Sequence, residues 1–332
     1  MCPSRLPCLT AIKNGEPTLR RRIAALPEID LASTLQFVIN AAAGSSDARA
    51  KREDVEAALR AHGRQGELLF CSPAQLTGVA HQAASRSIAT RTAVVAVGGD
   101  GTFNYFARTH GIPAVPADAV RQLLHSVPTP VQVACINDRV FLVNASLGLY
   151  PDLLEDREAY KARFGRSRWV AFVAACATLL RAQRRLRLHI EMGGKVRDMQ
   201  TLTLFVGNNR LQLQQFGAEP DDTVAGTPGD GSMAALVLRP IGTLSMIGLM
   251  LHGAMGRLGE AAGVERFEFE HLVVRPTLPQ GRSGVKVAFD GEVKMMRAPL
   301  DFRVLAKPLY LLKPQPDAAD IGARSRAEEA AP

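Results

Sequence analysis

The run TAVVAVGGDGT, at Thr92–Thr102, decides how the first part of this chain folds. Four apolar residues, Val94–Val97, lead directly into a glycine-rich turn. An all-apolar strand is typical of a parallel sheet whose two faces are both covered by helices. Glycines let the main chain turn sharply and bring N–H groups close to a bound phosphate. The run therefore predicts a covered parallel strand that ends at a binding loop.

Two strand-and-helix units precede this run. Leu35–Asn40 and Glu67–Cys71 are short apolar stretches of the strand type. Asp47–His62 reads as a helix after the first stretch, and Ser72 opens a second helix, with Gln75 completing a capping box. Strands that alternate with helices in this way predict a parallel sheet flanked by helices.

Beyond Pro128 the pattern changes to many short strands. Asn137-Asp138 separates two apolar stretches and predicts a hairpin. Further strands are expected at Arg187–Met192, Thr201–Val206, Ser232–Leu238, Arg266–Val274, Val285–Phe289 and Asp301–Leu305. Two predicted helices, Ser167–Arg185 and Gly242–Leu258, interrupt them. We expect a second domain of antiparallel strands, arranged as a sandwich.

Composition and charge narrow the functional classes. The 332 residues are 47% hydrophobic, enough for two packed domains, and the net charge of +8 favours acidic partners such as nucleotide phosphates or anionic lipid surfaces. Aromatic residues make up only 5% and do not alternate with basic ones, which weakens the case for a nucleic-acid-binding protein. The five cysteines form no C-x-x-C pair, so a zinc site is not expected. Ile241–Gly256 is apolar but too short to span a bilayer.

The glycine-rich loop carries the strongest chemical signal. Asp100 lies between its glycines and supplies a negative charge for a magnesium ion or for a hydroxyl proton. The alternative is a tight turn without a ligand. No Gly-Lys-Ser/Thr follows, so the loop is not of the Walker A type.

At this point the sequence resembles a known family. The Gly-Gly-Asp-Gly-Thr loop is similar to that of the superfamily of diacylglycerol, sphingosine and NAD kinases. Segments that resemble the lipid-kinase branch follow in order over residues 35–310: Phe37–Gly44, Phe141–Gly148, Gly207–Asn209, Asp230–Met233 and Asp290–Glu292. The chain is therefore similar to the diacylglycerol kinase catalytic-domain family, the bacterial diacylglycerol/sphingosine-type lipid kinases.

The resemblance implies a fold and an activity. The fold is an α/β nucleotide-binding domain with a shortened parallel sheet, plus a second, mainly antiparallel β-sandwich domain. Residues 1–33 would form an N-terminal extension, 34–127 the nucleotide-binding domain, 128–313 the lipid-substrate domain and 314–332 a disordered tail. The activity is the ATP-dependent phosphorylation of a diacylglycerol- or sphingosine-like lipid hydroxyl.

The resemblance also implies roles for single residues. The nucleotide-binding residues would be Asn40, Gly44, Gly98, Gly99, Asp100, Gly101, Thr102 and Asn104. Glu292 would be the general base, with Asp290 and Asp100 as further catalytic residues. Asp230 would hold Mg²⁺, helped by main-chain oxygens near Thr227 and Ser232. On spacing alone, Asn40 could cap a turn, and both Asp-Gly pairs are common turn dipeptides.

One part of the family pattern is broken. The family has two nucleotide loops, and the second has the form Pro-x-Gly-Thr-x-Asn-x-Phe-Ala-Arg. Here Gly101–Arg108 resembles the end of the second loop, yet it is joined directly to the start of the first. The simplest explanation is a deletion of a helix and a strand, roughly 30 residues.

The break leaves three functional readings open. The first is an active lipid kinase, and the second is an impaired relative that only binds nucleotide or lipid. The third is an NAD kinase or another small-molecule kinase, which the Asp-Gly-Glu segment disfavours. The expected partners are ATP, Mg²⁺ and a lipid at a membrane surface, not nucleic acid, and a homodimer stays open. We expect a cytoplasmic protein that meets its lipid at the inner membrane surface.

Overall fold

We describe the protein from a computed structural model. The described residues are 28–41, 48–98, 101–152, 154, 185–208, 231–240, 264–278 and 284–314. The predicted helix Gly242–Leu258, and all of Ser167–Arg185 except Arg185, lie outside these residues. None of the described helices is long and apolar enough to cross a membrane.

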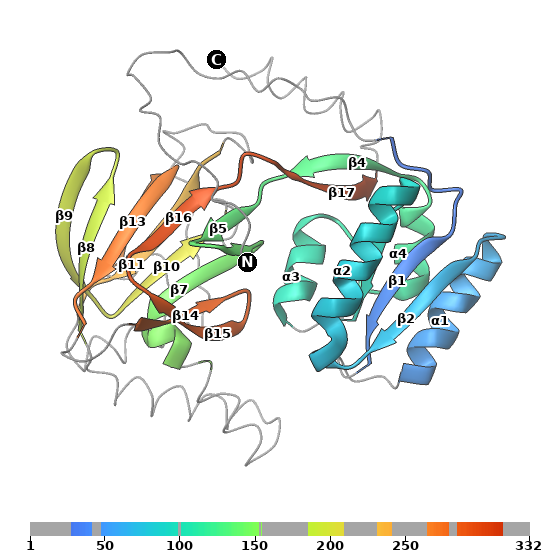
Figure 1. Cartoon of the computed structure of the whole chain (residues 1–332), viewed down its shortest axis with the longest axis horizontal. Coiled ribbons are helices and arrows are strands. Elements are labelled where there is room, and N and C mark those ends of the chain that lie inside the picture. Colours follow the sequence, from blue (N-terminus) through green and yellow to red (C-terminus); the bar gives the residue numbers. More distant parts are fainter. Residues whose placement is uncertain are drawn as a thin grey trace, which may run out of the picture.

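The first part is a three-stranded parallel sheet with helices on both faces (Figure 1). Its strand order is β2-β1-β3, with β2 at Gly66–Cys71, β1 at Leu35–Asn40 and β3 at Val94–Val97. Its helices are α1 (Ala48–Ala61), α2 (Pro73–Thr90), α3 (Gly101–Thr109) and α4 (Pro116–Leu123). The predicted parallel sheet is confirmed.

The sheet has a different core on each face. On one face Phe37 and Ile39 of β1 pack with Leu59 of α1 and Val120 of α4. On the other face Val38 packs with Ala83 of α2. Successive residues of a strand point to opposite faces, so the apolar run of β1 serves both cores.

Strand β3 departs from the prediction of a strand covered on both faces. Val95 and Val97 pack against the core of α1 and α4, but Ala96 is exposed and Val94 is 38% exposed. In the described sheet β3 is an edge strand with β1 as its neighbour. An apolar sequence therefore lies here at a partly uncovered edge, which proteins usually protect with charge or proline.

The second part consists of two six-stranded antiparallel sheets. The first has the order β12-β11-β10-β7-β14-β15, namely Val264–Phe269, Met233–Leu238, Thr203–Gly207, Asn144–Gly148, Gly284–Phe289 and Glu292–Arg297. The second has the order β6-β5-β16-β13-β8-β9, namely Arg139–Phe141, Ala134–Ile136, Leu300–Val304, His271–Pro276, Leu186–Met192 and Lys195–Thr201. One apolar core, with Leu147 and Leu204 from the first sheet and Leu272 and Phe302 from the second, joins them. The predicted sandwich is confirmed.

Two details of the strand prediction are wrong or incomplete. Arg266–Val274 was expected to be one strand, but Glu270 is a bend that divides it into β12 and β13, and these belong to different sheets. Strands form at Ser126–Val131 and Leu309–Pro314, where none is predicted. Strands β9 and β15 are also not predicted from the sequence. Both carry mostly exposed side chains and therefore lack a long apolar run.

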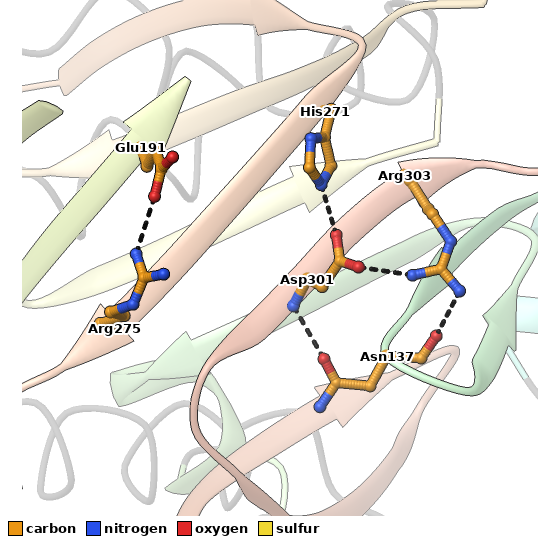
Figure 2. A network of polar contacts seen from close by, with 6 residues as sticks. All are labelled: Asn137, Glu191, His271, Arg275, Asp301 and Arg303. Atoms are coloured by element: carbon orange, nitrogen blue, oxygen red, sulfur yellow. Dashed lines mark hydrogen bonds and ion pairs between the residues drawn. The ribbon is translucent and has the colours of Figure 1, made fainter. Parts of the chain in front are cut away.

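The predicted hairpin at Asn137-Asp138 joins β5 to β6. Asn137 has a φ of 54°, and its main chain and side chain are both held by the neighbouring strand β16 (Figure 2). Its Oδ1 accepts from the Asp301 N–H at 2.8 Å, and its carbonyl accepts from Arg303 at 3.1 Å. Asp301 in turn pairs with His271 at 2.6 Å. The turn is thus fixed by a polar network on the outer side of the second sheet.

A two-stranded sheet links the two parts. It pairs β4 (Ser126–Val131) with β17 (Leu309–Pro314), and β17 also contacts α4. Figure 1 shows this pair running between the helices and the antiparallel sheets. Pro128 and Pro130 lie in β4, and proline is tolerated there because the strand has only one partner.

Candidate functional site

The predicted nucleotide residues begin where the parallel strands end. Ile39 is paired with Val97, so Asn40 and Gly98 follow at the same, carboxyl edge of the sheet. Gly98 has a φ of 90°, a conformation that glycine adopts without strain. Open α/β sheets bind their ligands at this edge. The structure therefore brings Asn40 and Gly98 together as predicted.

Helix α3 starts immediately beyond this edge. It begins at Gly101, with Thr102 half-buried and Asn104 exposed in its first turn. The N-terminus of a helix attracts anions because its first N–H groups have no partner within the helix. In Figure 1, α3 lies between α2 and the antiparallel strands. The remaining predicted nucleotide residues, Gly44, Gly99 and Asp100, lie outside the described residues.

Directly after α3, a histidine packs against β17 of the two-stranded sheet. Lys313 Nζ of β17 lies 3.4 Å from His110 Nδ1, and the Phe106 ring contacts the imidazole edge-on at 4.5 Å. Burial and the nearby ammonium lower the pKa of His110 from 6.5 to about 4. Burial also lowers the pKa of Lys313. The imidazole is therefore neutral at pH 7, and its Nδ1 can accept a hydrogen bond from the Lys313 ammonium.

Asp290 lies in the two-residue turn between β14 and β15. Its carboxylate accepts three main-chain N–H groups: Leu142 at 2.7 Å, Val143 at 2.8 Å and Asn144 at 3.1 Å. Its own N–H donates to the Asn144 carbonyl at 2.9 Å. Asp290 and Gly291 have φ values of 45° and 89°, as a tight hairpin requires. The Asp-Gly pair is thus a turn, and its carboxylate holds the segment before β7.

Glu292 is the first residue of β15. Its side chain is 66% exposed, and its carboxylate pairs with Lys294 at 2.8 Å. Lys294 Nζ also lies 5.4 Å from the centre of the Phe289 ring. An ion pair between two exposed side chains contributes little to stability, so an incoming group can displace it. Glu292 is accessible, as its predicted role as general base requires.

Asn208, from the predicted Gly-Asn turn, is buried at the end of β10. Its N–H donates to the Val143 carbonyl at 2.9 Å, and its Nδ2 donates to the Leu142 carbonyl at 3.0 Å. Nδ2 also donates to the carbonyl of Gln132 at 2.9 Å. The motifs that contain Asn144, Asn208 and Asp290 therefore meet around one segment, Leu142–Asn144.

Gln132 completes this cluster and was not predicted. The residue is only 8% exposed, and its side chain contacts Asn208, Gly231 and Ser232. No motif marks this residue, because a buried amide that binds main-chain atoms leaves no pattern in the sequence. Its contacts with two predicted segments, Gly207–Asn209 and Asp230–Met233, could be found only in the folded chain.

The predicted metal ligands are described only in part. Asp230 and Thr227 lie outside the described residues. The Ser232 carbonyl accepts from Gln132 Nε2 at 2.9 Å and keeps a second lone pair, so it is a hard oxygen ligand of the kind that Mg²⁺ prefers. Within the described ranges, His, Cys, Asp and Glu form no group of three that could hold a metal.

Comparison with known proteins gives the same family as the motifs. Residues 34–109 match the model of the diacylglycerol kinase catalytic domain. A crystal structure of a diacylglycerol kinase from Bacillus anthracis is 14% identical and has a TM-score of 0.54, over 82% of this chain and 93% of that one. A second structure from this organism, described as a "putative diacylglycerol kinase", is 17% identical with a TM-score of 0.59, over 82% and 94%.

These identities are low enough that the two structures establish the fold alone. The matched segment, by contrast, contains β1 with Asn40, β3 followed by Gly98, and α3 with Thr102. The predicted resemblance is confirmed for this segment. The similarity to the diacylglycerol kinase catalytic-domain family therefore covers residues 34–109 of this chain.

Proposed function

We propose that this protein is an ATP-dependent kinase that phosphorylates a diacylglycerol- or sphingosine-like lipid hydroxyl. The observation that carries the proposal is the meeting of Asn40, Gly98 and the start of α3 at one edge of the parallel sheet. This edge offers main-chain N–H groups and a helix N-terminus to a phosphate. Gly44, Gly99, Asp100 and Gly101 would complete the nucleotide site.

Glu292 would act as the general base. It would take the proton of the lipid hydroxyl while the hydroxyl oxygen forms a bond to the γ-phosphorus and the bond to the β-phosphate oxygen breaks. The products are a lipid phosphate and ADP. Asp290 would support this step indirectly, because its bonds to Leu142–Asn144 fix the start of β7 next to the turn that precedes Glu292.

Magnesium, when bound, would neutralise phosphate charge. Asp230 and the main-chain oxygens near Thr227 and Ser232 would hold a structural Mg²⁺, and Asp100 would face the ion that accompanies ATP. The lipid would be met at a membrane surface, which fits the net charge of +8. We propose a cytoplasmic location.

A second candidate function is an impaired relative that binds nucleotide or lipid without turnover. The exposed side of β3 favours it, since Val94 and Ala96 would normally be covered in a complete sheet. A deletion between the two nucleotide loops would remove a covering helix, a neighbouring strand and one glycine loop. Phosphoryl transfer depends on positioning, so such a loss should lower the rate by orders of magnitude.

The experiment is phosphate transfer from labelled ATP to diacylglycerol and to sphingosine in mixed micelles. We expect Glu292→Gln to lower turnover by about 100-fold or more while ATP affinity stays within about twofold. Glu270→Gln, an exposed glutamate in the bend after β12, is the matched control and should keep wild-type turnover.

Asp100→Ala, measured by Mg²⁺-dependent ATP binding, tests the loop separately. We expect binding to be lost, because the loop has no other charged side chain. A wild-type protein that binds ATP but labels no lipid would favour the impaired relative. A Glu292→Gln variant with full turnover would remove Glu292 from the mechanism and leave Asp100 as the candidate.

A further inference from the structure

The buried Gln132 lies where the chain leaves the link strand β4 and enters the sandwich at β5. Its Oε1 accepts from the Gly231 N–H at 3.2 Å. Its Nε2 donates to the Ser232 carbonyl at 2.9 Å and to the main-chain carbonyl of Asn208. Asn208 Nδ2 returns a bond to the Gln132 carbonyl at 2.9 Å. One amide thus joins three separate stretches of chain.

The partners fix the orientation of this amide. The Gly231 N–H can only donate, so it must face Oε1, and the two carbonyls can only accept, so they must face Nε2. A glutamate could keep the first bond but not the other two. A methionine of similar length could keep none. Because the site is buried, a lost bond leaves main-chain groups without a partner.

The bonded stretches are those with predicted roles at the candidate site. Gly231 and Ser232 directly follow Asp230, the predicted magnesium ligand, and Asn208 binds the same Leu142–Asn144 segment as Asp290. Gln132 is also only one residue beyond β4, whose partner β17 reaches His110. The amide is therefore the point where the link strand and the candidate site are joined by hydrogen bonds.

We propose that Gln132 is a positioning residue: its amide holds the Ser232 carbonyl and the Gly231–Ser232 segment in place for the bound metal. The consequence for catalysis rests on the proposed lipid kinase function, but the positioning itself does not. Gln132 touches neither substrate nor the reacting atoms in this role. It acts by fixing main-chain oxygens and by tying them to the chain that comes from the nucleotide-binding part.

Hydrogen exchange tests the positioning role of Gln132 without an assay of kinase activity. In Gln132→Met we expect the Gly231 amide to exchange about tenfold faster or more, because its acceptor is gone. Gln132→Glu retains that acceptor, so Gly231 should keep its protection. The amides of β13 serve as the internal reference for global unfolding, and Gln200→Met, at an exposed position of β9, is the control substitution. Unchanged Gly231 protection in Gln132→Met, with intact β13, would overturn the proposal.

Magnesium dependence separates positioning from a merely structural role. We expect both Gln132 variants to need about tenfold more Mg²⁺ for the same thermal stabilisation, since both lose the bond to the Ser232 carbonyl. Equal Mg²⁺ titrations in wild type and Gln132→Glu would overturn the proposal.

Turnover provides a further readout. If the wild type phosphorylates lipid, kcat should fall about tenfold in both variants with the KM for ATP unchanged. If the wild type phosphorylates nothing, the proposed function fails, and the exchange and Mg²⁺ titrations still decide the role of Gln132.

Discussion

Asp290 shows how one residue can satisfy two different expectations. Its φ of 45° and the glycine behind it form a hairpin turn, which spacing alone predicts. Its carboxylate also accepts three consecutive N–H groups of Leu142–Asn144, which spacing cannot predict. A carboxylate with this many main-chain donors stabilises the structure, so its removal should be visible in stability before it is visible in catalysis.

We therefore expect Asp290→Asn to lower the free energy of unfolding by about 1–3 kcal/mol, because the new NH2 group would face N–H donors. Urea unfolding followed by circular dichroism measures the change. The control Asp198→Asn removes a carboxylate from an exposed pair with His189 and should lower the free energy of unfolding much less. An Asp290→Asn midpoint equal to that of wild type would contradict the structural role.

Site residues could be predicted from the sequence where their role depends on neighbouring residues, and not where it depends on partners far away along the chain. Asn40, Gly98 and Asp290 terminate strands or form turns, and such positions leave fixed residue types in fixed order. Gln132 could not be found, because its partners are main-chain atoms far away in the sequence, which any residue could supply. The side-chain pairing of Lys313 with His110 could not be found either, because the two residues are far apart in the sequence.

At the scale of elements, β3 is the strand whose sequence and surroundings disagree. Its four apolar residues suit a strand with neighbours on both sides and helices on both faces. Among the described strands it has one neighbour, and α3 follows it almost at once. This is the arrangement expected if a helix and a strand are missing after the first nucleotide loop.

Restoring such a segment should therefore repair the sheet. We expect a helix-plus-strand insert of about 30 residues between Gly101 and Thr102, ending in Pro-x-Gly, to raise both the melting temperature and ATP-dependent lipid phosphorylation. Calorimetry and labelled-phosphate transfer measure the two effects. An insert of equal length at the open Gly193-Gly194 turn is the control and should raise neither. Lipid turnover by the unmodified protein at about 1–100 per second, as kinases show, would refute the deletion.

Strands could be predicted where they are buried along most of their length, because burial gives a run of apolar residues. Strand β1, with five buried residues and one half-buried residue, and β11, with six buried residues, have apolar runs that are visible in the sequence. Strands β9 and β15 carry mostly exposed side chains, so their sequences resemble loops. Strand β4 contains two prolines, which argue against a central strand, and it forms because it has one partner.

At the scale of the whole molecule, the link sheet β4–β17 sets how the two parts meet. The last described strand returns from the sandwich to contact α4, and its Lys313 reaches His110 at the end of α3. The sequence assigned residues 128–313 to the second domain, and that boundary stays a prediction. The pairing nevertheless places β17 beside elements of the first part.

This contact predicts a pH dependence. The pKa of His110 falls from 6.5 in the unfolded chain to about 4 in the folded one, so the unfolded state binds more protons between these values. Its contribution to stability is complete above pH 6.5 and is lost as the pH falls towards 4. Between pH 6.5 and 4 we expect the free energy of unfolding of wild type to fall by about 1–2 kcal/mol more than that of His110→Gln. This figure allows for the partial exposure of His110.

Urea unfolding at pH 7, 5.5 and 4.5 measures that difference. His81→Gln, an exposed histidine of α2, controls for the loss of an imidazole elsewhere. Parallel stability curves for wild type and His110→Gln would show that the folded state does not hold His110 neutral.

The pairing of β17 with β4 also determines when the link between the two parts can form during translation. The ribosome releases Ser126–Val131 early, but its partner Leu309–Pro314 emerges only after both antiparallel sheets have been synthesised. Until then β4 has an unpaired edge, and α4 lacks its contact with β17. A chain stalled shortly before Leu309 would therefore be a natural client for chaperones, although nearly all of its candidate site has already been made.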